Sequence, residues 1–334
     1  MQPKFSTSEA ANILHLTLPA LHKRIKSKGL DYSQYGRKAY FNHTTAKQVF
    51  NIDFKQKNIS FHVVKGGCGK STICWCFGIR ANLYGAKVLF VDVDQQANLT
   101  DALNVNPSDR PCLIDFVQKR KSIKELIYNV SDGIDLISSK MDNALLDKEM
   151  MFKSLPLDRI FKNPFDELRN DYDLILFDNP PSLSLTVKSI ALASDIVVSP
   201  VTPESFALSG LFLTSAELEE NAYDYNKVFN HKIVINKYDN RTSLSQMMLG
   251  EIARHEKFGT KLCDTYIRSS QEFSNAAANG GTIYDTLKST SAKEDIDTFT
   301  REILEIRTTK ENKIVLGSLS SSDKNSDTKL AANA

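Results

Sequence analysis

The chain has 334 residues, of which 41% are hydrophobic and 25% charged, a composition ordinary for a globular protein with a large core and an accessory domain. It contains no run of about 18 apolar residues, so we expect no membrane-spanning helix. Its N-terminus lacks the apolar stretch of a signal peptide. Five scattered cysteines favour reduced thiols in a cytoplasm over a disulfide framework.

The net charge of +2 hides an asymmetry along the chain. Residues 1–50 hold eight Lys/Arg and two acidic residues, a charge of +6, so the remaining 284 residues carry −4. A short basic end on a mildly acidic body is typical of a nucleic-acid-binding module joined to an enzyme.

This basic end has the pattern of two helices, a wing and a third helix. A capping box at residues 6–9 opens the first helix, and Thr17 caps a second helix, which stops at Gly29. Residues 36–41 are expected to form a wing, and residues 44–49 a closing helix.

Two helices at this spacing resemble the winged helix-turn-helix of MerR and excisionase proteins, which implies a DNA-binding domain over residues 1–50 and a linker over 51–56. The side chains that would read bases lie near the N-terminal half of the second helix: Pro19, Ala20, Lys23 and Arg24. Those that would contact phosphates are Lys26, Arg37 and Lys38.

Residues 64–72, with the sequence VKGGCGKST, follow a β-rich run at 59–63 and lead into a helix-like segment. They form a phosphate-binding loop in which Val64 takes the place of the usual first glycine. The remaining glycines let backbone N–H groups converge on phosphate oxygens, and the following helix adds the positive end of its dipole. Lys70 supplies a charge to the β- and γ-phosphates, and the Ser71 hydroxyl can ligate Mg²⁺.

Lys65 has no role in the simple loop. The pattern K-G-G-x-G-K-S-T resembles the deviant Walker A box of ParA- and MinD-type ATPases, whose extra lysine reaches the phosphates of the partner subunit in an ATP-sandwiched dimer. The resemblance implies a homodimer that binds ATP and Mg²⁺, with Lys65 and Lys70 among its catalytic residues. The expected nucleotide contacts in the loop are Lys65, Gly66, Gly67, Cys68, Gly69, Lys70, Ser71 and Thr72.

Two buried-strand patterns end in carboxylates. Residues 87–94 are similar to a family element in which Asp94 acts on the attacking water and Asp92 arranges the phosphate and metal environment, although Gln95 replaces the family's usual proline. The second pattern resembles the family's Walker B strand, and Asp178 at its end would hold Mg²⁺ directly or through water.

Strand-like and helix-like stretches alternate along the rest of the chain, which predicts an α/β fold with a doubly wound, mostly parallel sheet flanked by helices. Ligands of such sheets bind at the carboxyl ends of the strands, where Lys70, Asp94 and Asp178 fall. The resemblance makes Asn236, at another strand end, the expected adenine reader, with a simple turn as the alternative. The expected strands are 59–64, 87–92, 134–138, 173–178, 195–200, 232–236 and 262–266, and the main helices are 71–84, 112–118, 144–153, 184–193, 205–225 and 243–257.

Residues 265–273 are similar to the I-R-x-R segment with which plasmid ParA proteins hold DNA without sequence preference. Ser270 or Gln271 stands where relatives carry the second arginine, which leaves Arg268 as the candidate DNA contact of this segment. We expect the ATPase domain to cover residues 57–310 and residues 311–334 to form a disordered tail.

Together the resemblances imply a cytoplasmic, nucleoid-associated partition ATPase, which dimerises with ATP, binds DNA and hydrolyses ATP under stimulation by a ParB-like centromere-binding partner. The N-terminal module would bind an operator and repress the protein's own operon. Two alternatives remain open. One is a MinD-like positioning ATPase, which needs an amphipathic C-terminal helix to reach a membrane. The other is a transcription regulator that uses nucleotide only as a switch.

Overall fold

The computed structural model describes residues 3–204 and 207–306. The strands of its large sheet are β4 (Lys57–Phe61), β5 (Val88–Asp92), β6 (Ile127–Ser131), β7 (Ile134–Ile137), β8 (Leu174–Asp178), β9 (Ile196–Val201), β10 (Asn230–Tyr238) and β11 (Leu262–Arg268). They lie in the order β11-β10-β9-β4-β8-β5-β7-β6, and each neighbouring pair is parallel except β6 with β7. The predicted doubly wound, mostly parallel sheet is confirmed.

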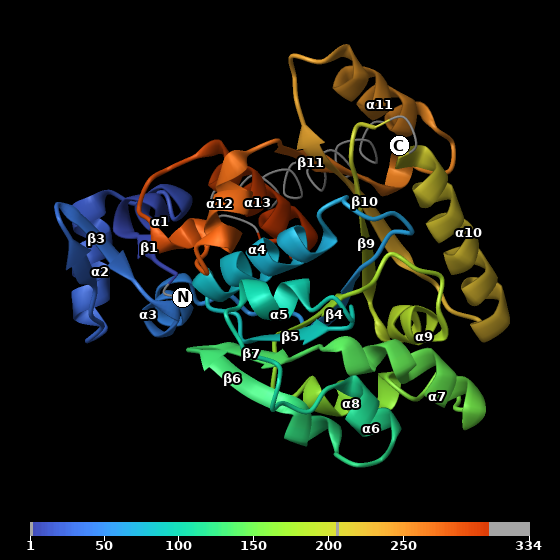
Figure 1. Ribbon diagram of the computed structural model, residues 1–334. Helices are drawn as coiled ribbons and strands as arrows, with labels where there is room; N and C mark the ends of the chain where they lie inside the picture. The colour runs from blue at the N-terminus through green and yellow to red at the C-terminus, as the bar shows by residue number, and fades with distance from the viewer. Residues whose placement is uncertain (1–2, 205–206, 307–334) are drawn as a thin grey trace, which may run out of the picture.

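Helices cover both faces of this sheet (Figure 1). The alternation along β5 shows why: Val88 and Phe90 join the hydrophobic cluster under α4 and α13, whereas Leu89 and Val91 join the cluster on the opposite face. The helices of the first face are α4 (Lys70–Leu83) and α13 (Ser291–Ile303), and those of the second include α6 (Leu113–Val117), α7 (Leu146–Phe152), α8 (Lys162–Leu168) and α9 (Leu185–Ala193). Over the β9–β11 end lie α10 (Ala207–Tyr225) and α11 (Ser243–Arg254).

Several elements differ from the sequence-based expectation. The pattern missed the antiparallel edge strand β6, the short helices α5 (Asn98–Ala102) and α8, and the helix α13. The expected helix over 144–153 begins with a 3₁₀ turn, η2 (Met141–Leu145), and becomes regular only in α7. The tail expected over residues 311–334 lies outside the described residues. An amphipathic C-terminal helix of the MinD type would fall in the same tail. No helix within the described ranges is both long and apolar enough to cross a bilayer.

Residues 3–50 form the predicted two helices and third helix, and the segment expected as a wing over residues 36–41 is the turn and second strand of a hairpin over residues 33–41. The Ser6 hydroxyl accepts from the backbone N of Glu9 at 3.1 Å, and the Thr17 hydroxyl accepts from that of Ala20 at 3.3 Å, so each caps the helix that follows it. The strand order of the small sheet is β1-β3-β2, and both pairs are antiparallel. The elements are β1 (Phe5–Ser6), α1 (Thr7–Ile13), α2 (Leu18–Ser27), β2 (Ser33–Tyr35), β3 (Lys38–Phe41) and α3 (His43–Phe50).

The N-terminal region packs directly against the body of the protein. One hydrophobic cluster joins Phe5 and Leu21 of this region to Tyr84 at the end of α4 and to residues of the large sheet. The residues 51–56, expected as a linker, have no regular structure but pack two apolar side chains, Ile52 and Phe54, against the same cluster. The region therefore shares its core with the body of the protein.

Arg80 of α4 is a buried charge at the contact between the N-terminal region and the body, and we call this contact the Arg80 joint. Its Nη2 atom lies 2.6 Å from Asp297 Oδ1 of α13 and 2.7 Å from Glu9 Oε1 of α1. Its guanidinium also lies over the rings of Phe5 and Tyr84, with 4.4 and 4.8 Å to their centroids. Burial alone would lower the pKa of Arg80, but the charges of Asp297 and Glu9 raise it, so the guanidinium stays protonated.

Replacing Asp297→Ala should destabilise the protein by about 3 kcal/mol, because the Arg80 guanidinium would stay buried with one carboxylate in place of two. Urea unfolding followed by circular dichroism measures this change. The matched control is Asp171→Ala, which removes an exposed carboxylate 3.7 Å from Lys124 Nζ and should leave the unfolding curve almost unchanged. Equal, small effects of both variants would contradict the importance of the Arg80 joint.

Candidate functional site

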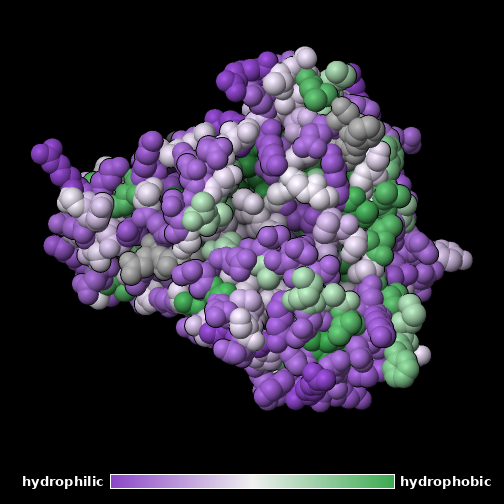
Figure 2. All heavy atoms as spheres, in the orientation of Figure 1, coloured by the Kyte–Doolittle hydropathy of each residue, from purple (hydrophilic) through white to green (hydrophobic). Residues whose placement is uncertain are grey.

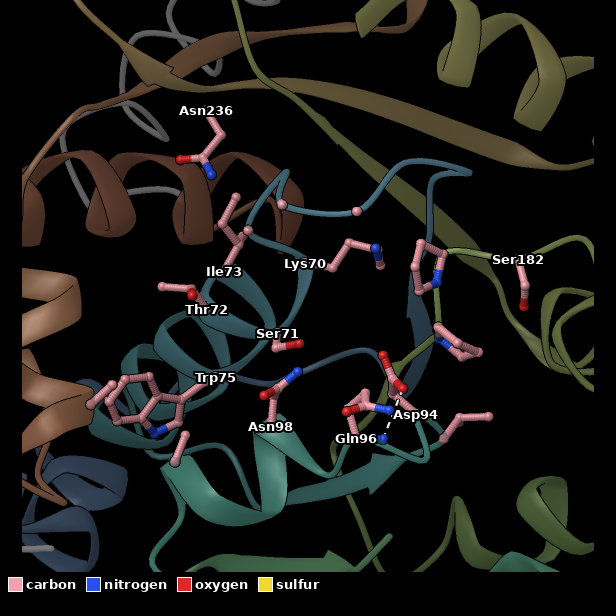
Figure 3. Close-up of a pocket in the computed structure, with 18 of the residues that line it drawn as sticks. Lys70, Ser71, Thr72, Ile73, Trp75, Asp94, Gln96, Asn98, Ser182 and Asn236 are labelled. Carbon is pink, nitrogen blue, oxygen red and sulfur yellow. Dashed lines mark hydrogen bonds between the residues drawn. The ribbon is translucent and has the colours of Figure 1, made fainter. Parts of the chain in front are cut away.

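A cavity of about 1290 Å³ opens where the carboxyl ends of β4, β5, β8 and β10 meet. Figure 3 shows Lys70, Ser71 and Asp94 around the same space, with Asn236 on the other side of the loop. The predicted nucleotide contacts that line the cavity are Gly66, Gly67, Gly69, Lys70, Ser71, Thr72 and Asn236. The sheet thus brings residues from distant parts of the chain to one site, as parallel-strand topology requires.

Four of the predicted nucleotide- and metal-site residues do not line this cavity. The Cys68 side chain is buried, and its Sγ donates to the Gly66 carbonyl at 3.7 Å, while its own carbonyl accepts from Asn236. Asp92 and Asp178 are fully buried at the ends of β5 and β8. Lys65 turns out of the cavity, and its Nζ lies 2.8 Å from Glu204 Oε2.

The loop ends in the first turn of α4. Gly67 and Gly69 have φ angles of 76° and 86°, a left-handed conformation that L side chains rarely adopt. This conformation lets the Lys70 side chain fold back, so that its Nζ donates to the carbonyl of Lys65 at 3.1 Å. Burial lowers the pKa of Lys70, while the nearby Asp178 carboxylate raises it.

Two side chains at the end of β10 donate hydrogen bonds to backbone carbonyls of the same loop. Asn236 Nδ2 donates to the Cys68 carbonyl at 2.8 Å, and Lys237 Nζ donates to the Gly67 carbonyl at 2.9 Å. The sequence predicted base recognition for Asn236, with a simple turn as the alternative, and the base recognition stays a prediction. It did not predict the contact from Lys237. Lys237 adopts a left-handed backbone with φ 55°, an uncommon conformation for lysine that places it over the loop.

The two carboxylates at the end of β5 are engaged in different ways. Asp92 Oδ2 accepts from the backbone N of Thr100 at 2.9 Å and from its hydroxyl at 2.7 Å, and Asp92 Oδ1 accepts from Asp94 N at 3.2 Å. These contacts tie α5 to the strand. Asp94 lines the cavity and accepts from Gln96 N at 3.0 Å (Figure 3).

Asp178 is the carboxylate whose surroundings fit a metal ion. Both its oxygens are buried and accept no hydrogen bond of acceptable geometry from the described residues. Burial raises the pKa of Asp178, and the neighbouring Ser71 hydroxyl and Lys70 ammonium lower it. An unpaired carboxylate beside a hydroxyl is a donor set that suits Mg²⁺, so Ser71 and Asp178 fit the metal implied by the sequence.

Arg268, the predicted contact for non-specific DNA, lies at the edge of the cavity. Its guanidinium donates to both oxygens of Asp295, at 2.6 Å from Nη2 and 2.9 Å from Nε, and Nη2 lies 3.5 Å from Glu294 Oε2. Two carboxylates therefore offset its charge. Its DNA contact stays a prediction, with less free charge than the sequence implied.

The predicted operator contacts lie together on the N-terminal region. On α2, Pro19, Ala20, Lys23 and Lys26 are exposed, while Arg24 is half-buried. Arg37 is exposed in the hairpin turn between β2 and β3. Lys38 instead donates from Nζ to the Leu287 carbonyl of the body at 2.9 Å. Lys38 thus differs from Lys23, Lys26 and Arg37, because its ammonium helps to join the two regions.

The loop geometry predicts how a substitution of Gly69 changes the affinity for ATP. A Cβ on Gly69 would lie 2.3 Å from Asn236 Nδ2, and the φ of 86° disfavours any side chain, so Gly69→Ala should weaken ATP binding by about tenfold or more. The control is Gly250→Ala in α11, outside the phosphate-binding loop, where a Cβ would make only an ordinary contact 3.7 Å from Arg254 Nη2. Trp75 is the single tryptophan and lines the cavity, so its fluorescence reports ATP binding directly. Equal affinities for the two variants would contradict the packing described here.

Comparison with known proteins identifies the family. A family model described as an AAA domain matches residues 56–234. A virulence-plasmid ParA family protein of Chlamydia trachomatis is 30% identical over 255 residues, which cover 72% of this chain and 91% of the relative. The sporulation initiation inhibitor protein Soj of Bacillus subtilis is 28% identical over 220 residues, covering 65% and 85%.

Solved structures agree with this comparison. A plasmid partition protein of Borrelia burgdorferi bound to AMPPNP superimposes with a TM-score of 0.63 at 21% identity, covering 75% of this chain and 99% of that one. Other neighbours of the same fold carry ATP, or an ATP analogue or ADP with magnesium. A family match over more than half of the chain and a relative at 30% identity together show that the protein belongs to the ParA family of P-loop ATPases.

Proposed function

We propose that this ATPase drives DNA partition through a cycle of ATP-dependent dimerisation. Two copies join around ATP and Mg²⁺, the dimer binds DNA, and a ParB-like centromere-binding partner stimulates hydrolysis and release. The observation that carries the proposal is the position of Lys65. Its ammonium lies outside the cavity of its own subunit and contacts Glu204. Lys70, in contrast, lines the cavity and donates from Nζ to a carbonyl of the loop. A second lysine that does not face its own phosphate site is suited to the site of another copy.

The face around the cavity supports a dimer. Leu183 lines the cavity and is 51% exposed, and Leu145, Met151 and Phe152 near it in α7 and η2 are exposed as well. Figure 2 shows apolar atoms over the α7 side of this face, beside the hydrophilic surface that covers most of it. Exposed apolar side chains at the rim of a polar cavity are typical of a surface that another protein covers.

The site residues divide the work of phosphoryl transfer to water. Lys70 and the loop N–H groups would bind the β- and γ-phosphates, and Ser71 and Asp178 would hold Mg²⁺, which offsets phosphate charge when bound. Two carboxylates line the cavity, Asp94 and Asp147. Both oxygens of Asp147 accept hydrogen bonds from the start of α9, so we assign Asp94 to the attacking water. We propose that Asp92 positions this segment through Thr100, because its oxygens are engaged in hydrogen bonds within the protein.

The partition role rests on the relatives as well as on the site. Proteins similar to this chain are described as ParA family proteins of virulence plasmids and as plasmid partition proteins. We infer that the exposed basic residues of α2 and the hairpin let this protein bind its own operator and repress its operon. A nucleotide-switched regulator would share these features but would show no turnover stimulated by a partner.

Two substitutions should separate dimerisation from hydrolysis. Asp94→Ala should bind ATP and dimerise but hydrolyse it at about 1% of the normal rate or less, because the water loses its carboxylate. Lys65→Ala should bind ATP as a monomer but fail to dimerise, because a charge-assisted contact to the partner's phosphates is lost. Light scattering with ATP and a phosphate-release assay measure both properties.

The parental protein supplies the control for this pair and for the partner. Its turnover should rise when DNA and a ParB-like centromere-binding protein are added. Hydrolysis by Asp94→Ala at the parental rate would refute the assignment of the water. An ATP-dependent dimer of unchanged strength in Lys65→Ala would refute the sandwich, and turnover indifferent to the partner would favour the switched regulator.

Point variants test DNA recognition better than deletion, because removing residues 1–50 would uncover Arg80 and Tyr84. Lys26→Ala should weaken binding to all duplexes and lower the salt dependence by about one phosphate contact, whereas Lys23→Ala should relax the preference for the operator over random duplexes. Lys121→Ala, an exposed lysine paired with Glu125 on the body, is the control. Fluorescence anisotropy on operator and random duplexes between about 50 and 200 mM salt measures these effects. An unaltered operator preference in Lys23→Ala would place sequence recognition elsewhere.

A further inference from the structure

The contact between Lys65 and Glu204 is built from two distant segments. Lys65 lies just after β4, at the start of the phosphate-binding loop, and Glu204 lies between β9 and α10. Their Nζ and Oε2 atoms are 2.8 Å apart, with 21% of the lysine and 56% of the glutamate side chain exposed. The hydrogen bond from Lys65 lowers the pKa of Glu204 and so favours its ionised form.

One face of α10 follows the chain segment that leads into this lysine. Residues 210, 214 and 217 share that face at helical spacing. The Thr214 hydroxyl accepts from Val64 N at 3.0 Å, and Glu217 Oε2 lies 3.5 Å from the ring Nε2 of the buried His62. At Gly210 the helix comes closest, since a Cβ there would lie 3.0 Å from the Lys65 Cβ.

This packing fixes where the lysine side chain begins but not where it ends. The backbone of Val64 and Lys65 is held by α10, whereas the ammonium is held by a single exposed carboxylate. A lysine side chain has four carbons between backbone and charge, so its end can leave Glu204 without disturbing the packing of α10. The segment is therefore arranged for movement of the ammonium alone.

We propose that Glu204 is a positioning residue, which holds the Lys65 ammonium within one subunit and must release it before the lysine can reach the phosphates of the partner. The inference rests on the proposed ATP-dependent dimer and adds a device that opposes it. Glu204 competes with phosphate for the same ammonium, so a single subunit keeps its lysine until a partner brings a more highly charged ligand. Dimerisation then has a threshold set in part by this pair.

The size of the threshold follows from the exposure of the pair. An exposed ion pair of this kind changes an equilibrium by roughly 1.4- to 5-fold. Two copies must each release a lysine when the dimer forms, so the effect is squared, to about 2- to 25-fold in the dimer dissociation constant. This range is large enough to measure and small enough for ATP to overcome.

The test replaces Glu204→Gln, which keeps the size of the side chain and removes its charge. Mass photometry or analytical ultracentrifugation in the presence of AMPPNP and Mg²⁺ should give a dimer dissociation constant about 2- to 25-fold lower than that of the parental protein. The matched control is Glu219→Gln on α10, whose pair with Lys257 has the same 2.8 Å separation and a glutamate 54% exposed. It should leave the dissociation constant unchanged, and both variants should keep the parental melting temperature.

A second measurement tests the pair without a dimer. Acylation of amines in the nucleotide-free protein, resolved by residue with mass spectrometry, should modify Lys65 roughly 1.4- to 5-fold faster in Glu204→Gln than in the parental protein. Lysines far from residue 204 serve as internal references. A proportional rise at Lys65 alone would show that Glu204 holds this ammonium, which a general loosening of the fold would not produce.

The outcomes separate this inference from the proposed function. An unchanged acylation rate at Lys65, or a dimer that Glu204→Gln leaves unchanged or weakens, overturns the positioning role even if Lys65→Ala abolishes the dimer. A parental protein that stays monomeric with AMPPNP overturns the proposed dimer and with it any threshold for dimerisation. In that case the acylation rate still decides whether Glu204 holds Lys65. A tighter dimer together with faster acylation supports both.

Discussion

The conformation of the loop between β4 and α4 is the constraint on which the rest of the site depends. Gly67 and Gly69 have left-handed φ angles, and the loop's carbonyls accept hydrogen bonds from Asn236 and Lys237 at the end of β10. Gly69 has no room for a methyl group against the Asn236 amide. The loop is thus shaped by a neighbouring strand end as well as by its own sequence. Any shift of β10 relative to β4 would therefore change how the loop presents its N–H groups to phosphate.

The helix that follows the loop links this site to the N-terminal region. Lys70 stands at the first residue of α4, and Arg80, about 15 Å along the helix axis, carries the charge that joins α1 and α13. A single rigid helix therefore has the nucleotide site at one end and the joint with the N-terminal region at the other. This arrangement explains why the first 50 residues, so different in charge from the body, share its hydrophobic cluster.

The sequence predicted the sheet and the local site because both leave short-range signals. Buried parallel strands read as continuous apolar runs, and the phosphate-binding loop has fixed spacing. The edge strand β6 was not predicted, because it is half-exposed and lacks such an apolar run. The helix α13 does carry a helical pattern, since Ala292, Ile296, Phe299 and Ile303 repeat at helical spacing and are buried. It was nevertheless absent from the expected helices.

What could not be predicted are the long-range polar partners. Nothing near Arg268 in the sequence indicates that Asp295 offsets its charge, and Lys38 meets a carbonyl 249 residues away. The pairing of Lys65 with Glu204 joins positions 139 residues apart. Such contacts follow from the topology, which brings loop ends together, and a propensity argument has no access to them. They alter charge, and therefore function, more than they alter the fold.

The two ion pairs that matter most in this chain differ in strength as their positions require. Arg80 is buried, and separating it from its carboxylates would leave an uncompensated charge at a cost of about 3–5 kcal/mol, which suits a permanent joint. The pair of Lys65 with Glu204 is partly exposed, and such pairs contribute at most about 1 kcal/mol. A stronger hold would keep the lysine from a partner altogether, and an apolar contact could not hold an ammonium at all. A weak, solvent-accessible carboxylate is therefore the kind of contact that a lysine exchanged between two sites can leave and regain in every cycle.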